Sequence, residues 1–222
     1  MAFVRSSTVT FCGCISLGFT MAANAALVDR GGGLIYDTDR NITWLQDANY
    51  AQTSGVNATG QLNWQDAVNW AANLSYGGYD DWRLPTTQVP DSGLSGGTCG
   101  NIPLSFGTGC AGGELGHMYY AELNGAVVGS PVPSSVPGPG PFTHLQADGY
   151  WSGTEFDATN AYVLNFGFSG QQAADQKFIG YYAWAVRDGD VAVPAPGAAW
   201  LLATGLFAVV ARARRRLSSG SR

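Results

Sequence analysis

The sequence predicts an α+β fold in which an antiparallel sheet is combined with two helices and long loops. Helix-like and strand-like runs occupy separate stretches of the chain and do not alternate, as they would around a parallel sheet. Aromatic residues make up 12% of the 222 residues, which indicates a packed core. A chain of this length is expected to form one or two domains.

The first expected elements are a hairpin and a helix. Short β-type runs at 34–36 and 42–45 flank the turn-rich sequence DTDRN, which is typical of a hairpin. Within residues 62–76, apolar residues recur at i, i+3, i+4 and i+7, the spacing of one helical face. Asn63 is placed to cap this helix, and a pair of glycines follows it.

A second helix is expected at 114–123, between two Gly- and Pro-rich loops at 89–113 and 125–141. The last third of the body is strand-like, with runs at 150–154, 161–168 and 183–187. This order of a hairpin, two helices, long loops and strands favours the α+β class.

Residues 1–25 have the pattern of a secretory signal peptide. Arg5 precedes an apolar stretch, and Ala-Asn-Ala follows it, which predicts cleavage by signal peptidase between Ala25 and Ala26. The alternative is a buried N-terminal strand. Residues 26–190 would then form the ectodomain.

Residues 191–222 combine a Pro motif, 15 uncharged residues from Gly197 to Ala211, and an Arg cluster. The apolar segment is short for a transmembrane helix, and the arginines are expected to stay cytoplasmic. The motif is Val193, Pro194, Ala195 and Pro196, and the cluster is Arg212, Arg214, Arg215 and Arg216.

This C-terminal order resembles the PEP-CTERM sorting signal, although Ala195 stands where Glu is typical. The resemblance implies an exosortase-type sorting enzyme as a partner. It also implies an inner-membrane intermediate, followed by the cell surface or extracellular matrix of a Gram-negative-type bacterium. The alternative is a plain membrane anchor.

Residues 26–193 contain five basic and sixteen acidic residues, a net charge of −11. Such a body repels phosphate and sulfated polymers unless a cation bridges them, which excludes an ordinary basic nucleic-acid binder. Export predicts that Cys99 and Cys110 form a disulfide bond. The alternatives are two free thiols or half of a metal site.

The body carries the motifs IYDTDRNITWLQDANY, WQDAVNWAANL, DDWRLPT, GYWSGTE and YYAWAVRDG in this order. They resemble the C-terminal domain of Lcl-type collagen-like adhesins over residues 28–189. The resemblance implies a fold similar to C-type lectins and formylglycine-generating enzymes. Formylglycine-type activity is not expected, because it needs reactive cysteines and the only two in the body lie in a loop insertion.

The motif residues are interpreted mainly as structural. They are Trp82, Arg83, Pro85, Trp151, Trp184 and Arg187. Core packing is favoured for the tryptophans over a sugar-stacking platform, and Arg83 is expected to hold carbonyls or a carboxylate rather than a ligand acid. Exposure is expected instead for loop aromatics, namely Tyr76, Tyr79, Phe106 and Phe142.

Asp37, Asp39 and Asn41 offer oxygen atoms at alternate positions, as calcium loops do, but the Gly and distant Glu of an EF-hand are missing. The alternative is a β-turn in which these side chains bond the backbone. His117 and His144 are candidate bases to which the sequence assigns no partner.

These observations predict an exported, non-catalytic, lectin-like module that binds polysaccharide, with calcium as a candidate cofactor and without nucleic acid as a partner. One alternative is a purely structural envelope or matrix protein. The other is a glycan hydrolase with a carboxylate pair, one member of which would have a raised pKa.

Overall fold

The computed structural model describes residues 27–100, 105–123, 140–167 and 170–191. The predicted signal peptide with its cleavage point, most of the 125–141 loop, the Pro motif, the apolar segment and the Arg cluster lie outside these residues. Within the described parts of the chain, no helix is both long enough and apolar enough to cross a membrane.

The α+β class is confirmed, but the strands form two sheets rather than one. The first sheet has the order β1 (Leu27–Gly31), β2 (Leu34–Asp37), β3 (Ile42–Leu45), β9 (Val186–Asp188), and all its pairs are antiparallel. The second has the order β4 (Gln61–Leu62), β8 (Tyr181–Tyr182), β5 (Gly149–Glu155), β6 (Asn160–Asn165), β7 (Gln171–Gln176). In the second sheet β5 and β8 are parallel.

The helices are short. The helix expected near residue 64 is α2 (Trp64–Ala72), whose N-cap Asn63 accepts a hydrogen bond from the backbone N–H of Asp66 at 2.9 Å. The second expected helix begins as α3 (Glu114–His117) and continues as a π-helix, η1 (Met118–Glu122). A further short helix, α1 (Tyr50–Thr53), was not predicted.

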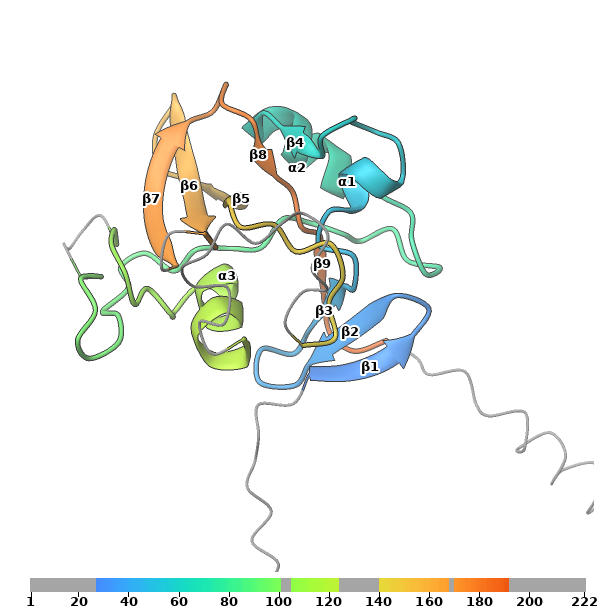
Figure 1. The fold of residues 1–222 in the computed structure, drawn as a ribbon, viewed down its shortest axis with the longest axis horizontal. Coiled ribbons are helices and arrows are strands. Elements are labelled where there is room, and N and C mark those ends of the chain that lie inside the picture. The colour runs from blue at the N-terminus through green and yellow to red at the C-terminus, as the bar shows by residue number, and fades with distance from the viewer. Residues whose placement is uncertain (1–26, 101–104, 124–139, 168–169, 192–222) are drawn as a thin grey trace, which may run out of the picture.

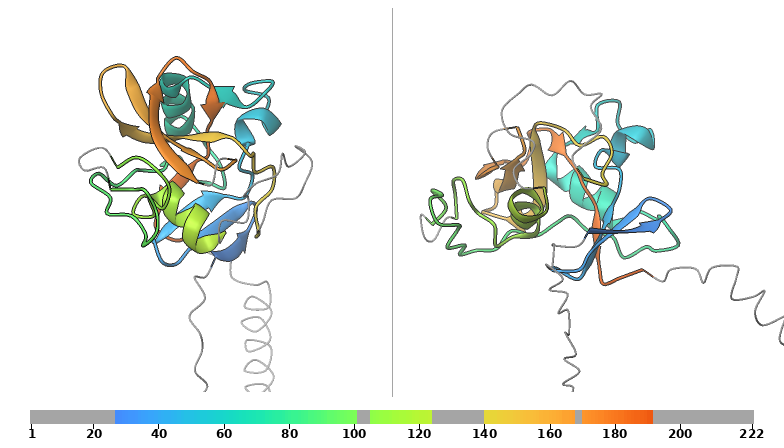
Figure 2. Two further views of the ribbon diagram at one scale, coloured as in Figure 1. Left: turned by 60° about the vertical axis from the view of Figure 1, so that its left-hand side comes forward. Right: turned by 60° about the horizontal axis from the view of Figure 1, so that its bottom comes forward.

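Figures 1 and 2 show the two sheets on opposite sides of the body, joined by the segment that runs from β8 to β9. This segment was predicted as one strand over 183–187, but residues 183–185 lie between the sheets. Trp184 is fully buried there, with ring centroids 4.6 Å from Trp44 of β3 and 5.8 Å from Tyr150 of β5. One aromatic core therefore serves both sheets.

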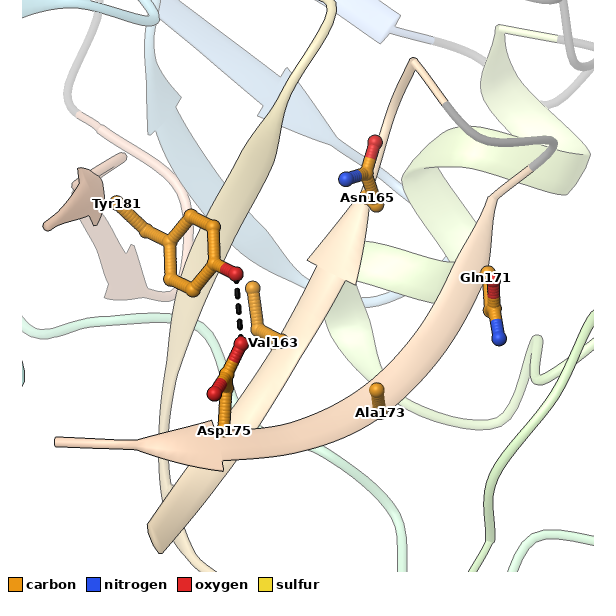
Figure 3. A pocket seen from close by; sticks show the side chains of 6 residues that line it. All are labelled: Val163, Asn165, Gln171, Ala173, Asp175 and Tyr181. Carbon is orange, nitrogen blue, oxygen red and sulfur yellow. Dashed lines mark hydrogen bonds between the residues drawn. The ribbon is translucent and has the colours of Figure 1, made fainter. Parts of the chain in front are cut away.

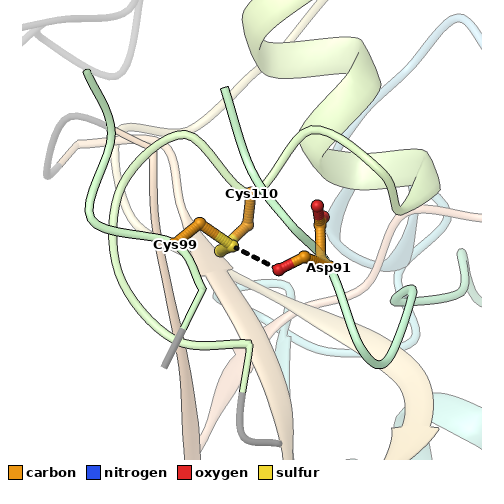
Figure 4. A group of neighbouring side chains, drawn as sticks. All are labelled: Asp91, Cys99 and Cys110. Carbon is orange, nitrogen blue, oxygen red and sulfur yellow. Dashed lines mark hydrogen bonds between the residues drawn. A yellow bond between two sulfur atoms is a disulfide. The ribbon is translucent and has the colours of Figure 1, made fainter. Parts of the chain in front are cut away.

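A disulfide bond and several hydrogen bonds hold the Gly-rich loop at 89–113 in place. Cys99 and Cys110 form the predicted disulfide bond (Figure 4). The buried carboxylate of Asp91 accepts hydrogen bonds from the backbone N–H groups of Gly93 and Gly112, at 2.8 and 2.7 Å. Backbone bonds between Gly107 and Gln172 then attach the loop to the edge of the second sheet at β7.

Candidate functional site

One candidate for a binding site is a hollow on one face of the second sheet (Figure 3). It has a volume of about 250 Å³. Strands β6, β7 and β8 supply its lining, which consists of Val163, Asn165, Gln171, Ala173, Asp175 and Tyr181.

The alternation of side chains along the strands explains this lining. Residues two apart on a strand point to the same face, so Val163 and Asn165 of β6 share a face with the odd-numbered lining residues of β7. The register places Asn165 opposite Gln171 and Val163 opposite Ala173. Two amide side chains therefore lie at one end of the hollow, beside an apolar floor of small side chains.

Tyr181 lies at the other end and depends on a glycine. A Cβ atom at Gly149 of β5 would come within 2.5 Å of the Tyr181 ring, so only glycine lets the ring lie over β5. The Tyr181 hydroxyl reaches β7 and donates a hydrogen bond to Asp175 Oδ2 at 2.7 Å. Trp151 supports the ring edge-on, with 5.0 Å between centroids.

The electrostatics of the hollow favour an uncharged ligand. Burial, followed by the hydrogen bond to Asp175, raises the pKa of Tyr181 to about 12, so its hydroxyl is neutral at physiological pH. Among the lining residues that the structure describes, Asp175 alone carries a formal charge. A carboxylate without a cation in the lining repels anions, whereas it accepts hydrogen bonds from ligand hydroxyls.

Phe178, an exposed aromatic residue, lies close in the sequence to two strands that line the hollow. Phe178 is 77% exposed and belongs to the turn of residues 177–180, which connects the β7 and β8 lining residues. Single exposed apolar side chains are common on protein surfaces, and contact with a ligand would remove the apolar area of this ring from water. Phe178 was not among the candidate residues predicted from the sequence, and nothing in the local sequence Lys177-Phe178-Ile179-Gly180 marks its ring as exposed.

The motif tryptophans lie in the core. Trp82 is 3% exposed, Trp151 and Trp184 are fully buried, and each indole N–H donates to a backbone carbonyl. None of the three therefore presents a ring face to solvent.

The expectation of exposed loop aromatics is wrong for Phe142, which is 2% exposed and packs edge-on against Trp184 at 4.8 Å. Tyr76, Tyr79 and Phe106 are half-buried. The physical reason is that the loops close over the core and add their own rings to it.

Arg83 forms a bidentate ion pair with Glu114, at 2.7 and 2.8 Å, and also bonds Asp188 and the carbonyl of Leu84. Its guanidinium therefore connects α3 to β9.

Arg187 pairs in the same bidentate way with Asp81, at 2.7 and 2.8 Å. The carbonyl of Pro85 accepts hydrogen bonds from the hydroxyl of Ser152 and the N–H of Gly153, which ties the DWRLPT segment to β5.

The three residues of the calcium hypothesis make turn contacts. Asp37 Oδ1 accepts hydrogen bonds from the backbone N–H groups of Asp39 and Arg40, both at 3.0 Å. Asn41 Oδ1 accepts one from the Tyr36 hydroxyl at 2.8 Å. The other oxygen of Asp37 points away from the turn, toward His117 on α3, at 3.9 Å.

Both histidines, which the sequence left without partners, have acidic neighbours. His117 Nε2 lies 3.0 Å from Glu122 Oε1, and His144 Nδ1 lies 3.1 Å from Asp47 Oδ2. The proximity of His117 to Asp37 was missed, because nothing local to either segment predicts that they meet.

Comparison of the chain with protein-family models, curated proteins and solved structures finds no match. The resemblance to the Lcl-type domain therefore stays a prediction, and function has to be inferred from the side chains.

Proposed function

We propose that this protein is an exported, lectin-like binding module that holds a neutral extracellular polysaccharide at the hollow on β6, β7 and β8. The observation that carries the proposal is the grouping of two amides, one carboxylate and one tyrosine on a single sheet face. Sugar hydroxyls both donate and accept hydrogen bonds. Amide side chains offer both functions, and the Asp175 carboxylate accepts.

The shape of the hollow supports a polymer as the ligand. It lies open on a sheet, and its volume is below that of the enclosed pockets that usually hold small molecules. An extended glycan would place one sugar in the hollow and continue along the surface. We propose that Phe178 stacks on a neighbouring sugar ring of the same chain.

The charge of the body supports the choice of a neutral glycan. The net charge of −11 over residues 26–193 opposes the approach of sulfated or phosphorylated polymers. Acidic glycans would need a bridging cation, and calcium is the candidate. The binding assay therefore includes calcium and chelator arms.

The proposal includes the predicted export route through signal peptidase, a membrane-bound intermediate and an exosortase-type enzyme. The disulfide bond supports it, since such bonds persist in oxidising compartments outside the cytoplasm. If sorting removes the C-terminus, intact mass spectrometry of the mature protein will show that Arg212 to Arg216 are gone. A mass that still includes them contradicts sorting.

Burial favours binding over the hydrolase alternative. Burial and neighbouring carboxylates raise the pKa of Glu122 to about 7, and Asp37 lies in the same cluster, so a perturbed carboxylate is present. Both side chains, however, are only 1% exposed. A sugar ring therefore cannot reach these carboxylates. Glycosidic cleavage requires that two carboxyl groups flank the bond that is broken.

The test is a binding screen of the intact protein in detergent against the producing cell's exopolysaccharide and a panel of neutral glycans. We expect Gln171→Ala and Phe178→Ala each to weaken binding about tenfold, the equivalent of one lost hydrogen bond or stacking contact. The matched control is Val56→Ala, which shortens an apolar side chain that is 57% exposed and does not line the hollow.

The outcomes separate the alternatives. Failure to bind any glycan would favour a purely structural envelope or matrix protein. Binding that survives both substitutions would place the ligand elsewhere on the molecule. Binding that is abolished by chelator and unaffected by both substitutions would instead favour a calcium site.

A further inference from the structure

Three ionisable side chains converge where the β2–β3 turn meets the α3–η1 helix. His117 Nε2 lies 3.0 Å from Glu122 Oε1 and 3.9 Å from Asp37 Oδ2, and one ligand atom of each residue lies within 4.8 Å of the others. Both carboxylate side chains are 1% exposed, whereas the imidazole is 13% exposed. The cluster is thus buried, with its imidazole facing the solvent side.

One carboxylate oxygen atom of this cluster lacks a hydrogen-bond partner among the described residues. Asp37 Oδ1 is satisfied by two backbone N–H groups, but Oδ2 is buried and has no hydrogen-bond partner among the residues that the structure describes. Burial of a carboxylate oxygen without a partner is strongly unfavourable. Oδ2 points toward His117, so the missing partner belongs at the centre of the cluster.

The nearby guanidinium of Arg40 does not supply this missing partner. Two carboxylates face one imidazole, and the guanidinium of Arg40 donates to the carbonyl of Ala111 at 2.9 Å instead of to either carboxylate. A cation at the centre would supply the partner that Asp37 Oδ2 lacks among the described residues.

The π-helix is what brings His117 and Glu122 together. Residues five apart in an α-helix are about 140° apart around the axis, because each residue turns by about 100°. In η1 the N–H of Leu123 bonds the carbonyl of Met118, five residues earlier, so the winding is wider. The wider turn places residues 117 and 122 on one side, and π-turns of this kind are frequent at functional sites.

We propose that Asp37, His117 and Glu122 bind a divalent transition-metal ion of the Zn²⁺ class. One imidazole nitrogen and two carboxylate oxygens form a ligand set that suits zinc, whereas calcium takes oxygen ligands only. Tetrahedral zinc with bonds of about 2.0–2.1 Å separates its ligand atoms by about 3.3 Å. The observed 3.0 and 3.9 Å lie on either side of that separation, and all three ligand atoms lie within 4.8 Å of one another, so small side-chain shifts let them bind one ion and leave a fourth position for water.

A second group of potential metal ligands in the described residues is not available to bind an ion. Asp91, Cys99 and Cys110 also lie close together, but the two sulfur atoms are bonded to each other and Asp91 bonds the backbone (Figure 4). The proposed ion would tie the first sheet to the helix, and its residues are separate from those of the hollow. This inference therefore stands or falls independently of glycan binding.

The test is a titration of the chelator-stripped, intact protein with Zn²⁺ in detergent, followed by calorimetry and thermal unfolding. We expect one ion per chain and a rise in Tm of roughly 5–10 °C at a hundredfold excess over Kd. His117→Ala and Glu122→Gln should each weaken Zn²⁺ binding at least tenfold. The matched control is His144→Ala, which removes the other histidine of the chain together with its Asp47 contact.

A second readout remains informative if a variant folds poorly. In the wild-type protein, Zn²⁺ should shift the NMR signals of the His117 ring and leave those of His144 unchanged. The proposal is overturned if Zn²⁺ does not bind, if the His144 signals shift instead, or if His144→Ala weakens binding as much as His117→Ala. It is also overturned if Ca²⁺ raises Tm as much as Zn²⁺ and His117→Ala leaves that rise unchanged.

Discussion

Removal of the disulfide bond should destabilise the protein through its unfolded state. The bond joins cysteines that are 11 positions apart in the sequence. For a closed loop of this size the chain-entropy relation gives about 3 kcal/mol at 25 °C. Because Asp91 and the Gly107–Gln172 bonds hold the loop independently, the folded loop should keep its conformation in the Cys99→Ser/Cys110→Ser variant.

The assays are urea unfolding and thermal unfolding of the oxidised wild-type chain and the double variant, both monitored by far-UV circular dichroism. We expect the free energy of unfolding to fall by about 3 kcal/mol and Tm to fall by roughly 6–12 °C, with an unchanged native spectrum. The matched control is Ser95→Ala, a change at an exposed position of the same loop that keeps both cysteines, and it should leave both values unchanged. A loss below about 1 kcal/mol would refute the entropic reasoning. A changed native spectrum would show that the bond, and not its neighbours, holds the loop.

Three further predictions concern the region around α3. In chelator, the free energy of unfolding should decrease as pH rises from about 4.5 to about 7, because folded Glu122 keeps its proton to about 7. Glu122→Gln should reduce that slope, and identical slopes in the two proteins would contradict the assignment. Gly116→Ala should cost about 3 kcal/mol in chemical unfolding, since its Cβ would lie 1.8 Å from the carbonyl oxygen of Cys110, and a neutral result would mean that α3 shifts freely. Arg83→Lys should cost about 1–2 kcal/mol in thermal unfolding, because lysine cannot make the bidentate pair with Glu114, and equal stability would show that the pair is replaceable.

Elements with a strong local pattern were predictable from the sequence. The apolar face and Asn63 cap specify α2, and the runs on either side of DTDRN specify the β2–β3 hairpin. The pairing of Cys99 with Cys110 was predicted from the expectation of export and from their being the two cysteines left in the body, and the structure has this bond. In each case the determining interactions lie close together in the sequence, or the choice of partners is small.

Elements that depend on a distant partner were not predictable. β7 has the polar sequence QQAADQ and carries no strand signal, but six residue pairs with β6 make it a strand. The segment around Trp184 reads as one strand, yet it passes between two sheets because its indole fills the core they share. Pairing and burial override local propensity in both cases.

The sequence by itself determined the α+β class, the aromatic core, the disulfide bond and the acidic character of the body. Only the tertiary structure decided which polar side chains share a face or a cluster. The hollow requires the register of β6 and β7 and the bare backbone of Gly149, and the Asp37–His117–Glu122 cluster requires a helix that departs from the 3.6-residue period. The physical reason is that local periodicity encodes which face of an element is apolar, whereas the meeting of distant polar groups is fixed only when the whole core packs.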